Sequence, residues 1–189
     1  KLLDFFKKIY NPHFEIGIQS VIQKANINNI VDVVLFAENN SAISRINLNL
    51  LMQPMNTKKT NDWHENKFRH LWPNNVKERN NLFDRLIELK KNDKVSKLLN
   101  SITQLKSFNV YFKNPKKTPK LVKCNYDKAI NINNNGEVFL CWHYDSIGNI
   151  KDNNLIEMWS NKKTNNIRKQ INSCSITDCW FRLNCLYSE

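Results

Sequence analysis

Alternating apolar and polar positions predict two strands in the first part of the chain, with a helix between them. The alternation runs over residues 14–22 and again over residues 46–50. Between these stretches, the apolar positions of residues 27–35 fall on one face of a helix, and Asn26 is the candidate N-cap. Strand, helix and strand in this order predict a βαβ unit, in which the two strands run parallel.

Two more helices are predicted in the middle of the chain and two short ones nearer its end. Apolar residues at helical spacing cover residues 82–89 and 95–105, and aromatic residues extend the second apolar face to Phe112. The same spacing predicts helices over residues 155–159 and 162–171.

Residues 57–73 are predicted to form a polar and aromatic loop. It contains His64 and His70, which could bind a metal ion. No cysteine or carboxylate pattern accompanies them, so we expect both histidines to be solvated loop side chains.

A β-hairpin is predicted in the last third of the chain. Ile130 and Ile132 alternate with polar residues, a polar turn ends in Gly136, and Val138 and Leu140 resume the alternation. Glycine supplies the positive φ that a tight turn needs. Because a hairpin brings its two ends together, residues that flank it can meet.

All five cysteines lie in this last third, and this clustering indicates a common chemical role. They are Cys124, Cys141, Cys174, Cys179 and Cys185. The first residues lack the apolar core of a signal peptide, so we expect reduced thiols, which in a cluster are typical metal ligands. An odd count also disfavours a complete set of disulfides. Spacing alone leaves zinc and an iron–sulfur cluster equally open.

Composition narrows the class of protein further. The chain has 189 residues, 41% of them hydrophobic, and a formal net charge of +12. Its lysines are spread through a sequence rich in asparagine and isoleucine, so we do not take the charge as evidence for nucleic-acid binding. No apolar run approaches the length of a membrane span. The sequence has no Gly-rich phosphate loop, Ser/His/Asp set or paired-carboxylate motif.

The residues around the first two cysteines resemble a known family. Eleven residues separate Cys124 from Gly136, and four separate Gly136 from Cys141. Gly148 and the run Leu-Ile-Glu-Met-Trp at residues 155–159 follow in the same order as in the SPASM or twitch domain. That domain is the auxiliary-cluster domain at the C-terminal end of many radical S-adenosylmethionine enzymes. The resemblance implies an iron–sulfur cluster rather than zinc.

The later cysteines depart from the full family pattern. The seven-cysteine version carries a Cys-x2-Cys-x5-Cys-x3-Cys run and holds two clusters, whereas this chain has Cys-x4-Cys-x5-Cys. The resemblance is therefore to the shorter twitch type with one auxiliary 4Fe–4S cluster. It implies Cys124, Cys141 and Cys179 as its firmest ligands, with Cys174 and Cys185 competing for the fourth place.

The βαβ unit is similar to the last strands of the radical S-adenosylmethionine partial barrel. The similarity covers residues 19–26 and 50–54. Barrels of parallel strands place their chemistry at the C-terminal strand ends. The resemblance therefore makes Gln19, Ser20, Gln53 and Asn56 candidates to line the active-site face, and the first three are candidates to bind the cofactor.

These expectations combine into an α/β fold class. The end of a partial (β/α) barrel, which contains the βαβ unit, is followed by helices and a small α+β SPASM/twitch domain with a β-hairpin. The expected divisions are residues 1–56 for the last barrel strands, 57–114 for a loop and bridging helices, and 115–189 for the iron–sulfur domain.

The catalytic Cys-x3-Cys-x2-Cys loop of the family is absent, since no cysteine precedes Cys124. We expect the C-terminal part of a cytoplasmic enzyme whose full length uses S-adenosylmethionine and a second 4Fe–4S cluster. Its substrate would be a peptide or small molecule, and its reductant a ferredoxin or flavodoxin. Neither a membrane nor a nucleic acid is an expected partner. The alternative is a non-catalytic zinc-binding module that contacts nucleic acid through its lysines.

Overall fold

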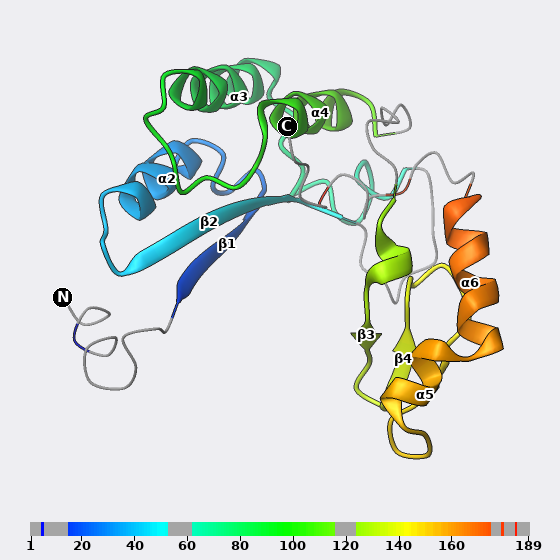
Figure 1. Cartoon of the computed structure of the whole chain (residues 1–189). Helices are drawn as coiled ribbons and strands as arrows, with labels where there is room; N and C mark the ends of the chain where they lie inside the picture. The colour runs from blue at the N-terminus through cyan, green and yellow to red at the C-terminus, as the bar shows by residue number, and fades with distance from the viewer. Residues whose placement is uncertain are drawn as a thin grey trace. The chain divides into compact units, whose positions relative to one another are not determined.

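The computed structural model describes Phe5 and residues 15–52, 62–115, 124–174, 179 and 184. The chain divides into two compact units (Figure 1). Residues 1–119 and 178–189 form the first unit, and residues 120–177 form the second.

The first unit contains the predicted βαβ arrangement. Strand β1 (Ile16–Ile22) and strand β2 (Ile43–Leu50) are parallel, and helix α2 (Ile30–Glu38) connects them. The helix begins later than predicted, with Asn29 rather than Asn26 at the N-cap position. Asn26 instead stabilises the turn after β1, because its side chain accepts the Gln23 N–H and donates to the Val21 carbonyl.

Two longer helices complete the first unit. Helix α3 spans Val76–Lys91 and helix α4 spans Ile102–Lys113. The prediction that residues 95–99 belong to the second helix was wrong. Leu98 instead forms a parallel bridge with Ile46, and the Leu99 N–H donates to the Ile46 carbonyl at 2.9 Å. The helix starts after Ser101, whose hydroxyl accepts the Gln104 N–H and caps it.

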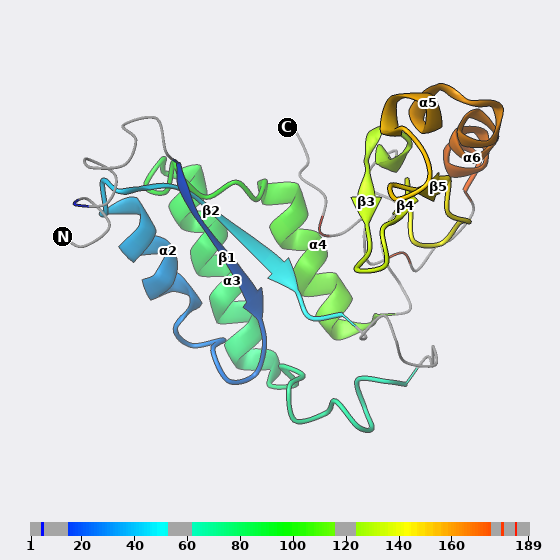
Figure 2. The ribbon, with the colours of Figure 1, turned by 90° about the horizontal axis from the view of Figure 1, so that it is seen from below.

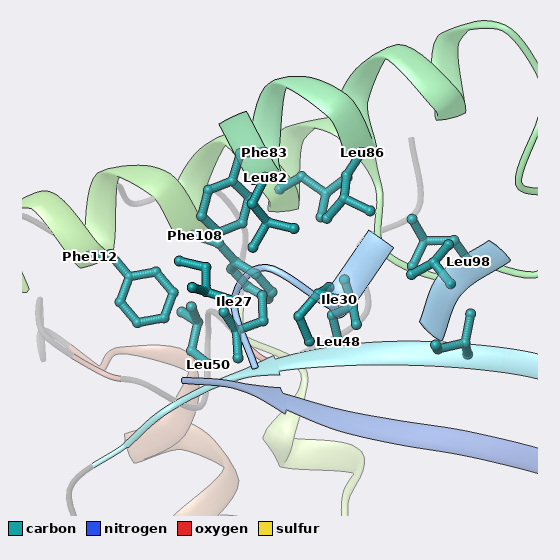
Figure 3. Close-up of a cluster of buried hydrophobic side chains, with 14 of the residues drawn as sticks. Ile27, Ile30, Leu48, Leu50, Leu82, Phe83, Leu86, Leu98, Phe108 and Phe112 are labelled. Atoms are coloured by element: carbon teal, nitrogen blue, oxygen red, sulfur yellow. The ribbon is translucent and has the colours of Figure 1, made fainter. Parts of the chain in front are cut away.

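Helices α2, α3 and α4 all cover the same face of the two-stranded sheet (Figures 1 and 2). Alternate residues of the strands point into the apolar layer between sheet and helices, which Figure 3 shows in close-up. The layer includes Leu48, Leu50, Phe83, Leu86, Phe108 and Phe112. The opposite face of the sheet carries Gly17, Gln19 and Arg45, which are exposed.

Asparagine side chains continue the pairing of β2 beyond the Leu98 bridge. Asn100 is fully buried, accepts the Leu48 N–H at 2.7 Å and donates to the Leu48 carbonyl at 2.9 Å. Asn184 then accepts the Leu50 N–H at 2.8 Å, and its amide lies 3.0 Å from the Met52 sulfur. The end of β2 is therefore held by a residue from the far end of the sequence.

The expectation of two solvated histidines was wrong for His64. His70 is exposed, but His64 retains only 7% of its accessible surface. Its ring lies 4.6 Å from that of Trp72, which in turn packs against Phe112. The segment before α3 is folded onto the core by aromatic contacts, which a polar composition does not reveal.

The second unit has a small core of its own. Its first elements are the 3-10 helix η1 (Tyr126–Lys128) and the strands β3 (Asn131–Ile132), β4 (Glu137–Phe139) and β5 (Gly148–Asn149), which form an antiparallel sheet. Helices α5 (Leu155–Ser160) and α6 (Lys162–Asn172) follow. The hairpin and both helices were predicted, whereas η1 and β5 were not.

The fold is thus mixed α/β, with a small parallel sheet, helices and a small antiparallel sheet. Membership of the parallel strands in a partial barrel stays a prediction, as do the three expected divisions of the chain. Within the described ranges, no helix is both long and apolar enough to cross a membrane.

Asn100→Ala should destabilise the first unit by roughly 2–4 kcal/mol, because it leaves two buried backbone groups of Leu48 without partners. Denaturant unfolding followed by circular dichroism measures the change. Asn81→Ala, on the exposed face of α3, is the matched control and should change stability by less than about 0.5 kcal/mol. Equal stability of the two variants would show that the Asn100 amide is dispensable.

Candidate metal centre

The β3–β4 hairpin joins the first two cysteines. Asn131 pairs with Phe139 and Ile132 with Val138. Between them Gly136 has a φ of 86°, in the left-handed region where other residues are strained. The Asn133 side chain accepts the N–H groups of Asn135 and Glu137, which fixes the turn.

A third strand supports the hairpin from its β4 side. Val138 pairs with Gly148, whose φ of 156° again favours glycine. A Cβ at Gly148 would overlap the Met158 sulfur, so this strand lies against α5 at a distance that only glycine permits. The packing places the loop between Cys141 and Gly148 over the small core.

Cys141 lies at the end of β4 in a buried position. The Asn131 side chain donates to the Leu140 carbonyl at 2.9 Å and thereby ties the start of β3 to this end of β4. The Tyr144 N–H donates to the Cys141 carbonyl at 3.1 Å, so the chain turns immediately after the cysteine. Cys141 belongs to the apolar core of the second unit, and Cys124 packs against that core.

Helix α6 brings a third cysteine to the same place. The Arg168 Nε donates to the Asp127 carbonyl at 3.2 Å, so α6 lies against η1, which begins two residues after Cys124. Cys174 follows the end of α6, and its N–H donates to the Ile171 carbonyl at 3.1 Å. Helix packing therefore relates Cys174 to Cys124, just as the hairpin relates Cys124 to Cys141.

Tyr144 packs against the core of the second unit and is joined to α6 by its hydroxyl. Its hydroxyl donates to the Gln170 carbonyl at 3.0 Å. Burial raises the pKa of Tyr144 to about 12, helped by a hydrogen bond with Cys174 and by the charges of Cys174, Cys141 and Cys124. All three thiols are thus close enough to act electrostatically on one hydroxyl.

The chemical type of these side chains matches the ligands of an iron–sulfur cluster. Iron–sulfur clusters are held by thiolates, and the described cysteines are thiols. Cys141 is buried in an apolar core, Cys124 is half-buried against that core, and Cys174 is half-buried. Among the described residues, no group of three or more Cys, His, Asp or Glu side chains is arranged so that it could hold a metal ion.

The remaining predicted residues lie elsewhere. Cys179 is buried and belongs to the first unit, whereas Cys185 and Gln53 fall outside the described residues, as does Asn56. Gln19 lines a cavity of about 480 Å³ with Arg45 and Asn47 on the face of the sheet without helices. Ser20 pairs with the buried Leu48 on the opposite face, so Gln19 and Ser20 do not point into one site.

No motif in the sequence indicates Tyr144, Asp127 or Arg168 as parts of this site. Tyr144 lies three residues after Cys141, which is the only local signal for it. The contact between Asp127 and Arg168 joins residues 41 positions apart, so no spacing rule reveals it.

Comparison with known protein families matches residues 124–180 to the SPASM family, described as an iron–sulfur cluster-binding domain. The matched range contains four of the five cysteines and ends before Cys185. Comparisons with curated proteins and with solved structures gave no match.

Gly148→Ala should destabilise the second unit by about 3 kcal/mol, since backbone strain and overpacking against Met158 add together. Iron bound after anaerobic reconstitution should fall with it, because the loop after Cys141 loses its support.

Gly17→Ala is the matched control. Its added Cβ meets only the flexible Arg45 side chain, and its φ is not in the left-handed region. It should bind as much iron as the unchanged protein. Full iron binding by Gly148→Ala would show that β5 does not support the site.

Proposed function

Because residues 124–180 belong to the SPASM family of iron–sulfur cluster-binding domains, we propose that this chain holds an auxiliary cluster for a radical S-adenosylmethionine enzyme. Iron–sulfur binding follows from the family itself. The observation that carries the proposal is this match, whose range includes Cys141 in the core of the second unit and Cys124 packed against that core. The zinc-binding, nucleic-acid-contacting alternative has no comparable support.

The proposed ligands are Cys124, Cys141, Cys174 and Cys179. A cubane cluster takes about four thiolates. All four lie inside the matched range. Cys185 lies beyond that range and is the proposed spare. This assignment changes the ranking made from spacing alone, because it moves Cys174 into the firm set.

The protein residues control the surroundings of the proposed centre. The apolar side chains of Val138, Leu140 and Met158 keep water from its hairpin side, and a hydrogen bond joins Cys174 and the Tyr144 hydroxyl. Burial and hydrogen bonds to sulfur tune the reduction potential of a cluster. When bound, an auxiliary cluster supplies either a one-electron redox centre or a binding point for substrate.

The first unit is the proposed binding side for cofactor and substrate. Gln19 and Asn47 stand side by side in the strand register, and Gly17 leaves room beside Arg45. Their cavity of about 480 Å³ falls within the usual range for small-molecule sites. Ser20 and Gln53 remain weaker candidates for the same role. The substrate class, a peptide or small metabolite, follows only from the family resemblance.

The complete reaction needs parts that these 189 residues do not contain. No cysteine precedes Cys124, so the catalytic Cys-x3-Cys-x2-Cys loop must come from another polypeptide segment or chain. We place the assembled enzyme in the cytoplasm, where reduced thiols and a ferredoxin or flavodoxin reductant are available.

Single cysteine-to-alanine variants test the ligand assignment. Changing Cys124, Cys141, Cys174 or Cys179 should each remove most of the iron bound after anaerobic reconstitution, because a cubane cluster needs about four thiolates. Cys185→Ala is the internal control and should bind as much iron as the unchanged protein. If Cys179→Ala kept its iron and Cys185→Ala lost it, Cys185 would be the fourth ligand and Cys179 the spare cysteine. Equal loss in all five variants would contradict a cluster with one spare cysteine.

A second experiment separates the auxiliary cluster from the catalytic one. Reconstituted with iron and sulfide, this chain should release no 5′-deoxyadenosine from S-adenosylmethionine under dithionite, since it lacks the three-cysteine loop. Chromatography of the reaction products measures the release. Sustained release from the chain alone would contradict the proposed division of labour.

A further inference from the structure

A second cavity in the first unit is lined by none of the cysteines and carries an excess of positive charge. Its volume is about 560 Å³, and it lies between the segment before α3, the first turn of α3 and the end of α4. Three cationic side chains line it, namely Arg69, Arg79 and Lys113. The only carboxylate among its lining residues is Glu65, whose oxygen lies 3.4 Å from the His64 Nε2.

Arg79 is the buried cation of this cavity. It retains only 5% of its accessible surface, and burial lowers the pKa of its guanidinium. Its Nη1 donates to the Pro73 carbonyl at 2.9 Å. Its Nε is buried and has no hydrogen-bond partner. No carboxylate of the described residues forms an ion pair with Arg79.

A purely structural role does not account for this arginine. Burying a charge without a countercharge costs folding free energy. A neutral side chain could donate the same hydrogen bond to the Pro73 carbonyl without that cost. Arg79 also lies in the first turn of α3, where the helix dipole disfavours a cation. The backbone N–H groups of that turn are already taken by Asn75, so they do not attract an anion themselves.

The rest of the lining offers an apolar wall beside the charges. Trp72 and Phe112 meet edge to face with ring centroids 5.0 Å apart, and both line the cavity. Asn66 and Asn74 add neutral hydrogen-bonding groups. A guanidinium presents a planar set of donors that matches the oxygens of a phosphate, and neighbouring cations favour a doubly charged group.

We propose that this cavity binds a small molecule through its phosphate group, with Arg79 as the central contact and Trp72 and Phe112 against its apolar part. Arg69 and Lys113 add charge at the opening. The site uses none of the proposed cluster ligands, so it goes beyond the proposed function and can be tested with or without bound iron.

Calorimetric titration of the whole chain with phenyl phosphate tests the proposal, and benzoate and inorganic phosphate serve as comparison ligands. Phenyl phosphate should bind more tightly than either, since it alone combines a dianion with an aromatic ring. Arg79→Gln should weaken its binding by about tenfold or more, the usual effect of losing a charge-assisted hydrogen bond. Arg85→Gln, an exposed arginine of α3 paired with Glu88, is the matched control and should leave binding unchanged.

The double variant Arg69→Gln/Lys113→Gln serves if Arg79→Gln does not fold, because its changes remove only charge at the opening. The double variant should weaken the binding of phenyl phosphate more than the binding of benzoate. Tighter binding of benzoate would reassign the site to carboxylates and overturn the proposal. Absence of binding, or equal binding by the unchanged protein and the double variant, would also overturn it.

Discussion

The packing of α6 against η1 is the contact on which the cysteine site depends. Thiols distant in sequence must meet if they are to share one cluster, and the hairpin can join only Cys124 and Cys141. The hydrogen bond from Arg168 to the Asp127 carbonyl fixes the end of α6 beside the segment that follows Cys124. Cys174 comes directly after that helix end, so a helix-packing contact completes what the hairpin begins.

A second long-range tie acts in the first unit. Strand β2 is paired along one edge first by the backbone around Leu98, then by Asn100, and finally by Asn184. Asn184 is therefore fixed at the C-terminal end of β2, although 134 positions of sequence separate it from Leu50. In sheets of parallel strands that end is where reacting groups are usually held. The cavity proposed for cofactor or substrate lies elsewhere on the sheet, because its strand residues come from the first and middle parts of β1 and β2.

Local signals in the sequence were sufficient for most of the fold. Alternation predicted β1, β2 and the hairpin, and helical spacing predicted α3, α5 and α6, because each signal lies within one element. Two of the predictions that were wrong depended on distant partners. Residues 95–99 have helical spacing, yet the edge of β2 binds them as an extended segment. His64 has polar neighbours in sequence, yet its ring lies against Trp72. The family of the cysteine region was predictable from spacing and glycines, whereas Tyr144 emerged only from the folded arrangement.

The central claim is that the cysteines of this chain hold an iron–sulfur cluster. Native mass spectrometry of the protein, prepared without oxygen and left unreconstituted, tests it most directly because it weighs the intact chain with whatever it binds. The account predicts one dominant species heavier than the chain by a cluster of about four irons and four sulfides. A dominant species that carries a single zinc ion instead would contradict it.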